Sequence, residues 1–322
     1  MAGKPMLIAV DTGNHSIKTP NTVFRACYTE YDGALGGDCL VYEGKSYSIC
    51  DKKFPHEDNK ANFDYMLLVM IAMAKEIMLK KEKRDLRLPE VIEQNVVLCL
   101  GLPPLHVKKY RDQYIEFYKR DYEFSYAGQK FKIHVDDVMI FSQCLAAANS
   151  QLGNIVSKGS NIYLIDIGGY TTDILNLVKE SGNGRVELNK DCIRTMNKGV
   201  LRMYSSIVNR IEEEKDYEIP FVDLDRYFLE TKRSVQLEDQ LHEIYDSVSK
   251  DYVFNLLNGF LEEGVKLTSA VPVFLGGGSQ IFMSHIKDYF AGKSHRYEPI
   301  FITDVKANAQ GYLDMGRNLR KE

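Results

Sequence analysis

The sequence lacks the patterns that mark zinc-binding, secreted and membrane proteins. Its six cysteines form no C-x-x-C pair, and its seven histidines are not spaced with them as zinc ligands are. The most apolar run, residues 66–74, is far shorter than the roughly 20 residues that cross a bilayer. No apolar signal-peptide region follows the first methionine. We therefore expect a cytoplasmic protein that makes no membrane contact and keeps most of its cysteines reduced.

An excess of positive charge is also missing. The chain carries 41 Lys and Arg residues against 45 Asp and Glu residues, which gives a formal net charge of -4. Proteins that bind nucleic acid directly present a basic face, and this balance argues against one without excluding a local basic patch. The 322 residues suit two domains at about 150 residues each. No low-complexity stretch or long Pro, Gly and Ser linker is present, so we expect short, hinge-like crossings between the domains.

Two stretches of the chain repeat one pattern, in which an apolar strand ends on an aspartate and a turn of small and hydroxyl residues follows. The first is residues 7–18 with Asp11, and the second is residues 161–177 with Asp166. A matched pair of such hairpins predicts two related halves that close on one phosphate chain from opposite sides. The turn residues are Thr12, Gly13, Asn14, Ser16 and Lys18 in the first hairpin and Gly168, Gly169, Thr171 and Thr172 in the second.

The residue types in these turns suit phosphate and magnesium. Adjacent glycines let a backbone approach a phosphate closely and aim its amide groups at it, and hydroxyl groups add further donors. Asp11 and Asp166 can hold Mg²⁺ through water, because this ion keeps several of its waters and takes few protein carboxylates. A single hairpin with glycine at its turn is common, so the prediction depends on the repeat.

A third glycine-rich segment, residues 270–280, is a buried strand that runs into a helix expected from about Ile281. Glycines between the carboxyl end of a strand and the start of a helix are where α/β sheets bind nucleotides. A glycine run alone is a weak signal, but after two aspartate-glycine hairpins it predicts a nucleotide-binding α/β protein. The residues concerned are Gly276, Gly277, Gly278 and Ser279.

Hydrophobic periodicity predicts the elements around these segments. Residues 62–81 predict a long, mostly buried helix, and residues 105–122 predict an exposed helix whose aromatic residues recur at helical spacing. That spacing favours packing over a nucleic-acid face. Residues 122–135 predict a hairpin, and Gly199 is expected to open another helix.

Residues 138–152 predict a helix with Gln143 near its start, on the side that could face a cleft. A glutamine there can orient a water molecule without repelling phosphate, and a surface amide is an equally good interpretation. Residues 221–264 predict a peripheral helical insertion, in which Asp223 caps a helix over residues 224–232.

Taken in order, these segments resemble the actin-like ATPase superfamily over nearly the whole chain. Residues 11–18 look like its first phosphate loop, residues 166–173 like its second, and residues 275–279 like its adenosine loop. The helices around Gln143 and after Gly199 look like the two that connect the domains. Within the superfamily the sequence is most similar to ParM-type plasmid-segregation actins of bacteria, through its short length, the strand end at residues 101–103, the hairpin at Gly128 and residues 307–311.

The resemblance implies a two-domain actin-like ATPase fold of the α/β class, with duplicated ribonuclease-H-like domains around a nucleotide cleft. Domain I would comprise residues 1–155, with a C-terminal helix at residues 305–322 packed back on it. Domain II would comprise residues 156–304, with the helical insertion at about residues 212–264.

The resemblance also implies roles for single residues. Asp11 and Asp166 would hold the Mg²⁺ ion through water, and Gln143 would position the attacking water. The turn residues of both hairpins would contact the phosphates, with Lys18 as a point charge and Asp173 at the edge of the second loop, while Gly276, Gly277 and Gly278 would lie under the ribose and base. Arg226 and Glu230 are candidates for the purine contact, although such a pair more often forms a surface ion pair.

The function implied is nucleotide-gated assembly. ATP or GTP with Mg²⁺ would close the cleft and favour a filament of identical subunits, and hydrolysis would release them. In ParM-type systems such filaments separate plasmid copies through a small DNA-binding adaptor, which fits a chain without a basic face. Three alternatives stay open: a small-molecule kinase, which would need an acidic base where Gln143 stands, a chaperone-like ATPase, and a scaffold that binds ATP without turnover.

Overall fold

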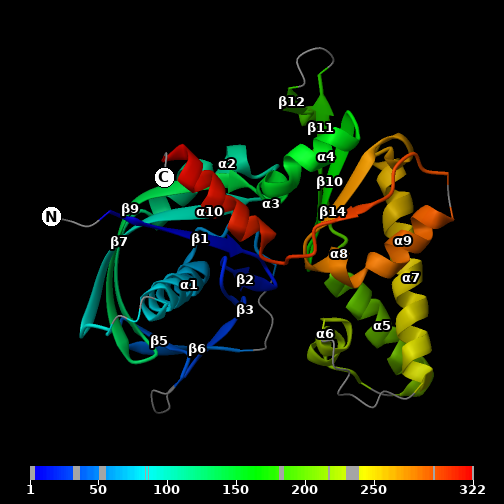
Figure 1. Cartoon of the computed structure of the whole chain (residues 1–322). Coiled ribbons are helices and arrows are strands. Elements are labelled where there is room, and N and C mark those ends of the chain that lie inside the picture. Colours follow the sequence, from blue (N-terminus) through cyan, green and yellow to red (C-terminus); the bar gives the residue numbers. More distant parts are fainter. Residues whose placement is uncertain are drawn as a thin grey trace. The chain divides into compact units, whose positions relative to one another are not determined.

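The computed structural model describes residues 4–31, 37–50, 56–83, 85, 87–180, 185–216, 218–229, 239–292 and 294–320. The chain forms two compact units, which we call unit 1 (residues 1–150 and 305–322) and unit 2 (residues 151–304). Each unit has its own β-sheet and helices (Figure 1). Each also has its own hydrophobic core. No helix among the described residues is long and apolar enough to cross a membrane.

The described strands of unit 1 form one sheet in the order β3-β2-β1-β7-β9-β8-β5-β6-β4. Its centre is parallel, because β7 pairs in parallel with β1 on one side and with β9 on the other. Antiparallel hairpins extend the sheet on both sides. The strands are β1 (Met6–Thr12), β2 (Ser16–Lys18), β3 (Val23–Arg25), β4 (Tyr28–Glu30), β5 (Cys39–Tyr42), β6 (Lys45–Ile49), β7 (Val91–Leu102), β8 (Asp121–Tyr126) and β9 (Gln129–Ser142).

Helices cover both faces of this sheet, and strand β1 shows how the sequence divides between them. Ile8 and Val10 join the core formed with helices α1 and α2, whereas Leu7 and Ala9 pack with helix α10. Successive side chains of a strand point to opposite faces, so β1 is apolar on both faces from Met6 to Val10. Figure 1 shows α1 and α10 on opposite faces of the sheet. The helices are α1 (Phe63–Glu82), α2 (Val107–Tyr118), α3 (Leu145–Ala148) and α10 (Ala307–Leu319).

Three helices of unit 1 follow their sequence predictions. The side chain of Asn62 caps α1 by accepting a hydrogen bond from the backbone N–H of Tyr65 at 3.0 Å. Small residues let α10 approach its neighbours, as predicted for Gly311: a Cβ atom there would overlap the backbone of Ala146. The tyrosines of α2 pack into the core, where Tyr114 and Tyr118 are fully buried.

Unit 2 repeats the central arrangement of unit 1. Strand β10 pairs antiparallel with β11 and in parallel with β14, as β1 pairs with β2 and β7. The repeat that the two hairpins predict is therefore visible in the topology of both sheets. The strands run in the order β12-β11-β10-β14-β15, with β13 paired to β11. Their bounds are β10 (Asn161–Ile167), β11 (Thr172–Lys179), β12 (Val186–Leu188), β13 (Arg194–Met196), β14 (Val271–Leu275) and β15 (Ile300–Phe301).

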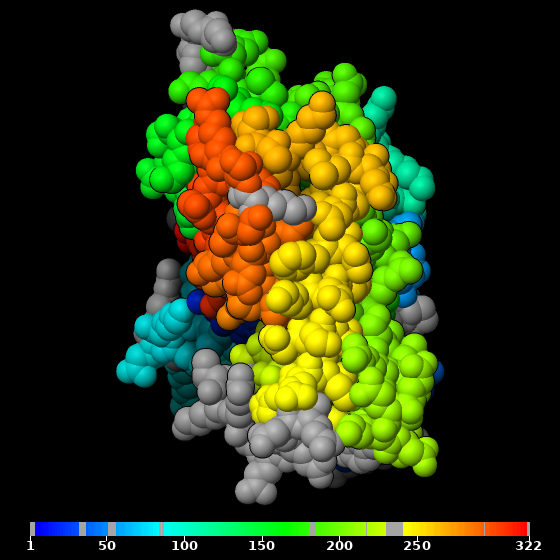
Figure 2. Space-filling view, turned by 90° about the vertical axis from the view of Figure 1, so that its right-hand side faces the viewer, coloured from blue at the N-terminus to red at the C-terminus, as the bar shows by residue number. Residues whose placement is uncertain are grey.

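The helices of unit 2 bury an apolar core against this sheet. Helix α5 starts after Gly199, as predicted, and its residues Leu201, Tyr204 and Ile211 are buried. Figure 2 shows α7 lying beside α9 and α5 on one face of unit 2. The helices are α4 (Leu152–Lys158), α5 (Val200–Lys215), α6 (Phe221–Leu229), α7 (Asp239–Glu262), α8 (Gly277–Ile281) and α9 (Met283–Ala291).

Three sequence predictions about local structure are wrong. The helix over residues 138–152 is absent at its start, because strand β9 continues to Ser142. Its apolar run pairs in parallel with β7, with Val138 opposite Leu98, and a short apolar run fits a buried strand as well as a helix. Asp223 does not cap a helix, since α6 already begins at Phe221. The helix expected from about Ile281 begins earlier, with α8 at Gly277.

Candidate functional site

The first hairpin brings three of the predicted site residues into contact. Asp11 lies one residue before the end of β1, opposite Lys18 of β2, and only 4% of it is exposed. The Nε2 atom of Gln143 donates a hydrogen bond to Asp11 Oδ1 at 3.0 Å. Lys18 Nζ lies 3.6 Å from Asp11 Oδ2. The buried carboxylate is therefore held by a neutral amide on one oxygen and a cation on the other.

Gln143 reaches Asp11 from a strained turn rather than from a helix. Cys144 has φ 62° and ψ -58°, and the N–H of Leu145 donates to the carbonyl of Gln143 at 2.6 Å. These values define a γ-turn with a positive central φ, which is rare outside glycine and stores strain. The N–H of Cys144 donates to Asn308 Oδ1 of α10 at 3.1 Å. The end of β9, this turn and α10 together fix the position of the glutamine.

The turn of the first hairpin is built around Gly13 and Asn14. A Cβ atom on Gly13 would lie 2.7 Å from the carbonyl oxygen of Ser16, so the turn requires glycine. The side-chain oxygen of Asn14 accepts hydrogen bonds from the hydroxyl of Tyr65 at 2.9 Å and the N–H of Glu57 at 3.0 Å. This oxygen anchors the turn to α1. A phosphate contact by Asn14 would therefore use its nitrogen atoms.

The second hairpin is tied to the start of α5. The N–H of Gly168 donates to the carbonyl of Thr171 at 2.8 Å, which closes the turn. The carbonyls of Gly168 and Gly169 accept hydrogen bonds from the first amides of α5, Val200 at 3.1 Å and Leu201 at 2.9 Å. With those two carbonyls turned toward α5, the loop is held in one shape by the helix that follows it.

Two predicted ligand residues turn their hydroxyls into the protein instead. Thr172 is fully buried, and its Oγ1 donates to the carbonyl of Lys198 at 2.6 Å. Ser279 is also fully buried, and its Oγ donates to the carbonyl of Gly276 at 2.8 Å. Both buried hydroxyls are thus satisfied within the protein, where they hold the loops in shape. Thr171 is only partly buried.

The glycine run places the start of α8 against Asp166. Gly276 has φ 84°, and a Cβ atom there would collide with the carboxylate of Asp166 and the carbonyl of Ile167. A Cβ on Gly278 would lie 2.8 Å from the Val200 side chain. Strand β10, helix α5 and helix α8 therefore meet at these glycines, and no residue with a side chain fits at Gly276 or Gly278 without moving its neighbours.

A partly buried tyrosine supports the same junction. The hydroxyl of Tyr252 donates to the carbonyl of Gly199 at 2.8 Å, directly before α5. Burial raises the pKa of Tyr252 to about 12, so the hydroxyl keeps its proton as a donor at neutral pH. Tyr252 carries no sequence motif, and the prediction from sequence did not include it.

The carboxylates fit an ion that keeps its own water. Asp11 and Asp166 each lie one residue before the end of the first strand of a hairpin. Within the described part of the chain, no three His, Cys, Asp or Glu side chains gather as a direct metal cage. Mg²⁺ is normally held by one or two carboxylates and several waters, and an aspartate is a ligand of this kind.

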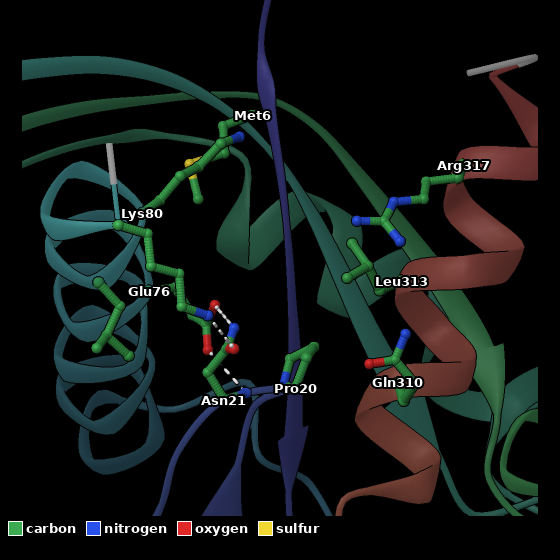
Figure 3. Close-up of a pocket in the computed structure, with 10 residues that line it drawn as sticks. Met6, Pro20, Asn21, Glu76, Lys80, Gln310, Leu313 and Arg317 are labelled. Atoms are coloured by element: carbon green, nitrogen blue, oxygen red, sulfur yellow. Dashed lines mark hydrogen bonds between the residues drawn. The ribbon is translucent and has the colours of Figure 1, made fainter. Parts of the chain in front are cut away.

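The purine-side candidates and one further cavity lie outside these hairpins. Arg226 pairs with Asp223 of the same helix at 3.3 Å, and Glu230 lies outside the described residues. A cavity of about 330 Å³ lies in unit 1 between α1 and α10 (Figure 3), where Asn21 donates to Glu76 at 2.7 Å. None of the predicted site residues lines this cavity.

Comparisons with known proteins show the fold. A model of the family described as archaeal actin homologue MreB-like, C-terminal, matches residues 164–288. A 15-stranded ParM filament from Clostridium botulinum has a TM-score of 0.71 at 17% identity, covering 98% of this chain and 100% of that chain. An archaeal actin homologue in complex with ADP has a TM-score of 0.68 at 17% identity, covering 97% and 99%.

Bacillus thuringiensis ParM with ATP has a TM-score of 0.65 at 13% identity, covering 99% of this chain and 100% of that chain. None of the curated proteins matches the sequence. The chain has the two-domain α/β fold of actin homologues, and the resemblance to actin-like proteins, ParM among them, is confirmed.

Proposed function

Starting from this actin-like fold, we propose that the chain is a filament-forming ATPase that binds ATP or GTP with Mg²⁺ and hydrolyses it to control its own assembly. The observation that carries the proposal is the hydrogen bond from Gln143 to Asp11 at the first hairpin. It joins the residue that would orient water to the residue that would hold the metal ion. The equivalent hairpin in unit 2 supplies the second aspartate.

The ligand roles divide between the two hairpins. Asp11 and Asp166 would hold Mg²⁺ through water, and the ion would supply positive charge opposite the phosphates. The amides of the glycine turns and Lys18 bind the phosphate oxygens. The glycines at the start of α8 lie under the sugar and base, where a side chain would block close approach. The residues of the turns are Thr12, Gly13, Asn14, Ser16, Gly168, Gly169 and Thr171, and those of the third loop are Gly276, Gly277 and Gly278.

Gln143 orients the attacking water. Its Nε2 is engaged by Asp11, so the side-chain oxygen is the atom that accepts a hydrogen bond from water. An amide can orient the water molecule without accepting its proton. This suits slow hydrolysis, which would set how long a filament lasts. A small-molecule kinase would need a base to accept the proton of its substrate.

Nucleotide state controls assembly through differential contacts. A triphosphate contacts both hairpins, and loss of its last phosphate removes part of those contacts, so the population shifts away from the form that assembles. Support comes from the names of similar structures, which include a filament and complexes with ADP and ATP. We extend the proposal to plasmid DNA segregation in the cytoplasm through a DNA-binding adaptor, in line with the acidic net charge of -4.

Light scattering at 90° tests the proposal directly. ATP or GTP with Mg²⁺ is added to the purified protein, and phosphate release is followed in the same cuvette. We expect scattering to rise and then decay as phosphate accumulates. Phosphate that is transferred only when a small metabolite is present would replace the proposal with a kinase, and a flat trace without turnover would leave a binding scaffold.

A matched pair of variants sharpens this test. Asp11→Asn removes the charge of the metal-holding residue, and Asp314→Asn is its control on α10. Asp314 resembles Asp11 in its partners: Gln310 Nε2 donates to it at 3.0 Å and Arg317 lies 3.4 Å away. We expect Asp11→Asn to abolish the scattering rise and Asp314→Asn to leave nucleotide hydrolysis unchanged. Equal loss in both variants would contradict the assignment of Asp11.

A further inference from the structure

Lys60 is a buried lysine placed directly behind the first hairpin. Only 6% of this residue is exposed, and its Nζ donates a hydrogen bond to the carbonyl of Thr12 at 2.5 Å. Thr12 lies between Asp11 and Gly13 in the hairpin. The ammonium also lies 5.4 Å from the centre of the Tyr65 ring. The cation therefore sits where the chain turns toward its proposed phosphate ligand.

The backbone of Lys60 is held from both sides by helix α2. Its N–H donates to the hydroxyl of Tyr114 at 2.9 Å, and its carbonyl accepts from the hydroxyl of Tyr118 at 2.5 Å. Burial raises the pKa of both tyrosines, so their hydroxyls stay protonated. A lysine with four rotatable side-chain bonds is normally mobile, and this clamp fixes the point from which its side chain extends.

The same segment also holds the other side of the turn. Asn14 accepts hydrogen bonds from the hydroxyl of Tyr65 and the N–H of Glu57. Residues 57, 60 and 65 thus contact both neighbours of Gly13, which are Thr12 and Asn14. We call this arrangement the hairpin brace.

The position of this ammonium suits ligand binding. Its Nζ lies against the carbonyl of Thr12, in the turn that would bind phosphate, and little of the residue is exposed. Opposite charges attract more strongly inside a protein than in water, so a phosphate chain at the hairpin would be drawn toward this cation.

We propose that Lys60 is a positioning residue for the nucleotide: it holds the carbonyl of Thr12 in place and adds positive charge beneath the phosphates. This inference rests on the proposed function, because it needs a phosphate ligand at the first hairpin. It predicts that the loss of affinity on removing the Lys60 charge grows with the number of phosphates on the ligand. A purely structural lysine would affect all nucleotides equally.

The test compares affinities for fluorescent analogues of ATP, ADP and AMP with Mg²⁺ at one ionic strength. Lys60→Met keeps the volume and removes the charge, Lys60→Arg keeps the charge, and Lys60→Gln keeps a donor without charge. The control is Lys75→Met on α1, where the lysine is also mostly buried and pairs with Asp38 at 3.0 Å. Thermal unfolding of each variant reports whether it folds.

We expect Lys60→Met to lose about tenfold in affinity for ATP, less for ADP and little for AMP. Lys60→Arg should stay within about threefold of the wild type, and Lys75→Met should match it. If Lys60→Met does not fold, Lys60→Gln is judged by the same criteria. Equal losses for all three nucleotides, or no loss in a folded variant, overturn the inference. A wild-type protein that binds none of them overturns the proposed function itself.

Discussion

Substitution of Gly276 gives the sharpest test of the site, because the side chain of an alanine there would press directly on the carboxylate of Asp166. Gly276 has φ 84° and ψ 166°, a region that is essentially restricted to glycine and costs other residues about 1–3 kcal/mol. The added Cβ would also collide with the Asp166 carboxylate and the Ile167 carbonyl. Overpacking of this kind costs about a further 1–3 kcal/mol. Gly276→Ala should therefore lower the free energy of unfolding by about 2–6 kcal/mol.

Gly264→Ala is the matched control in the same unit. Gly264 has φ 80°, and nothing lies within 4 Å of the position that its Cβ would take. Its substitution carries only the backbone cost, about 1–2 kcal/mol. Urea unfolding measures both stabilities, and titration with ATP and Mg²⁺ measures binding. We expect Gly276→Ala to lose nucleotide affinity while Gly264→Ala retains it. Equal stability losses and equal affinities in the two variants would refute the assignment of Asp166.

Three further predictions concern unit 1. Gln143→Ala should slow phosphate release by at least about tenfold, equivalent to about 1.4 kcal/mol of transition-state stabilisation, while nucleotide affinity measured by titration stays unchanged. The carboxylate of Asp121 raises the pKa of His134 above its usual value, so this pair contributes stability that is present at low pH and lost as pH rises through the raised pKa. NMR titration of Asp121→Asn should show a lower His134 pKa than in the wild type. The sulfur atoms of Cys27 and Cys50 lie 2.8 Å apart, so a mild thiol oxidant should join them in one disulfide, and peptide mapping that shows another pair would contradict this.

Local patterns were sufficient to predict both hairpins and the fold. The first turn can be predicted from its local sequence. An apolar strand leads to Asp11, and Gly13 fits where a Cβ atom would collide with the carbonyl of Ser16. The second hairpin at Asp166 repeats that chemistry. Two such hairpins and a glycine run in fixed order are specific enough to identify the actin-like fold.

Side-chain direction and long-range contacts could not be predicted in the same way. Thr172 has the residue type of a phosphate ligand, but its hydroxyl turns to Lys198, which is distant in sequence. The apolar run before Gln143 fits a strand or a helix equally well, and pairing with the parallel strand β7 decides between them. Lys60 contacts Thr12 across 48 positions of sequence, so no local pattern predicts this contact.

The position of α10 constrains how the chain is made. This helix covers one face of the unit 1 sheet, where Tyr312 packs with Ala9 and Cys99, yet residues 151–304 of unit 2 precede it in the sequence. A ribosome adds about 5–20 residues per second. That face of the sheet therefore stays without α10 for on the order of ten seconds while unit 2 is synthesised. Unit 1 is thus begun first and completed last, and a nascent chain must protect its apolar sheet during synthesis of the whole of unit 2.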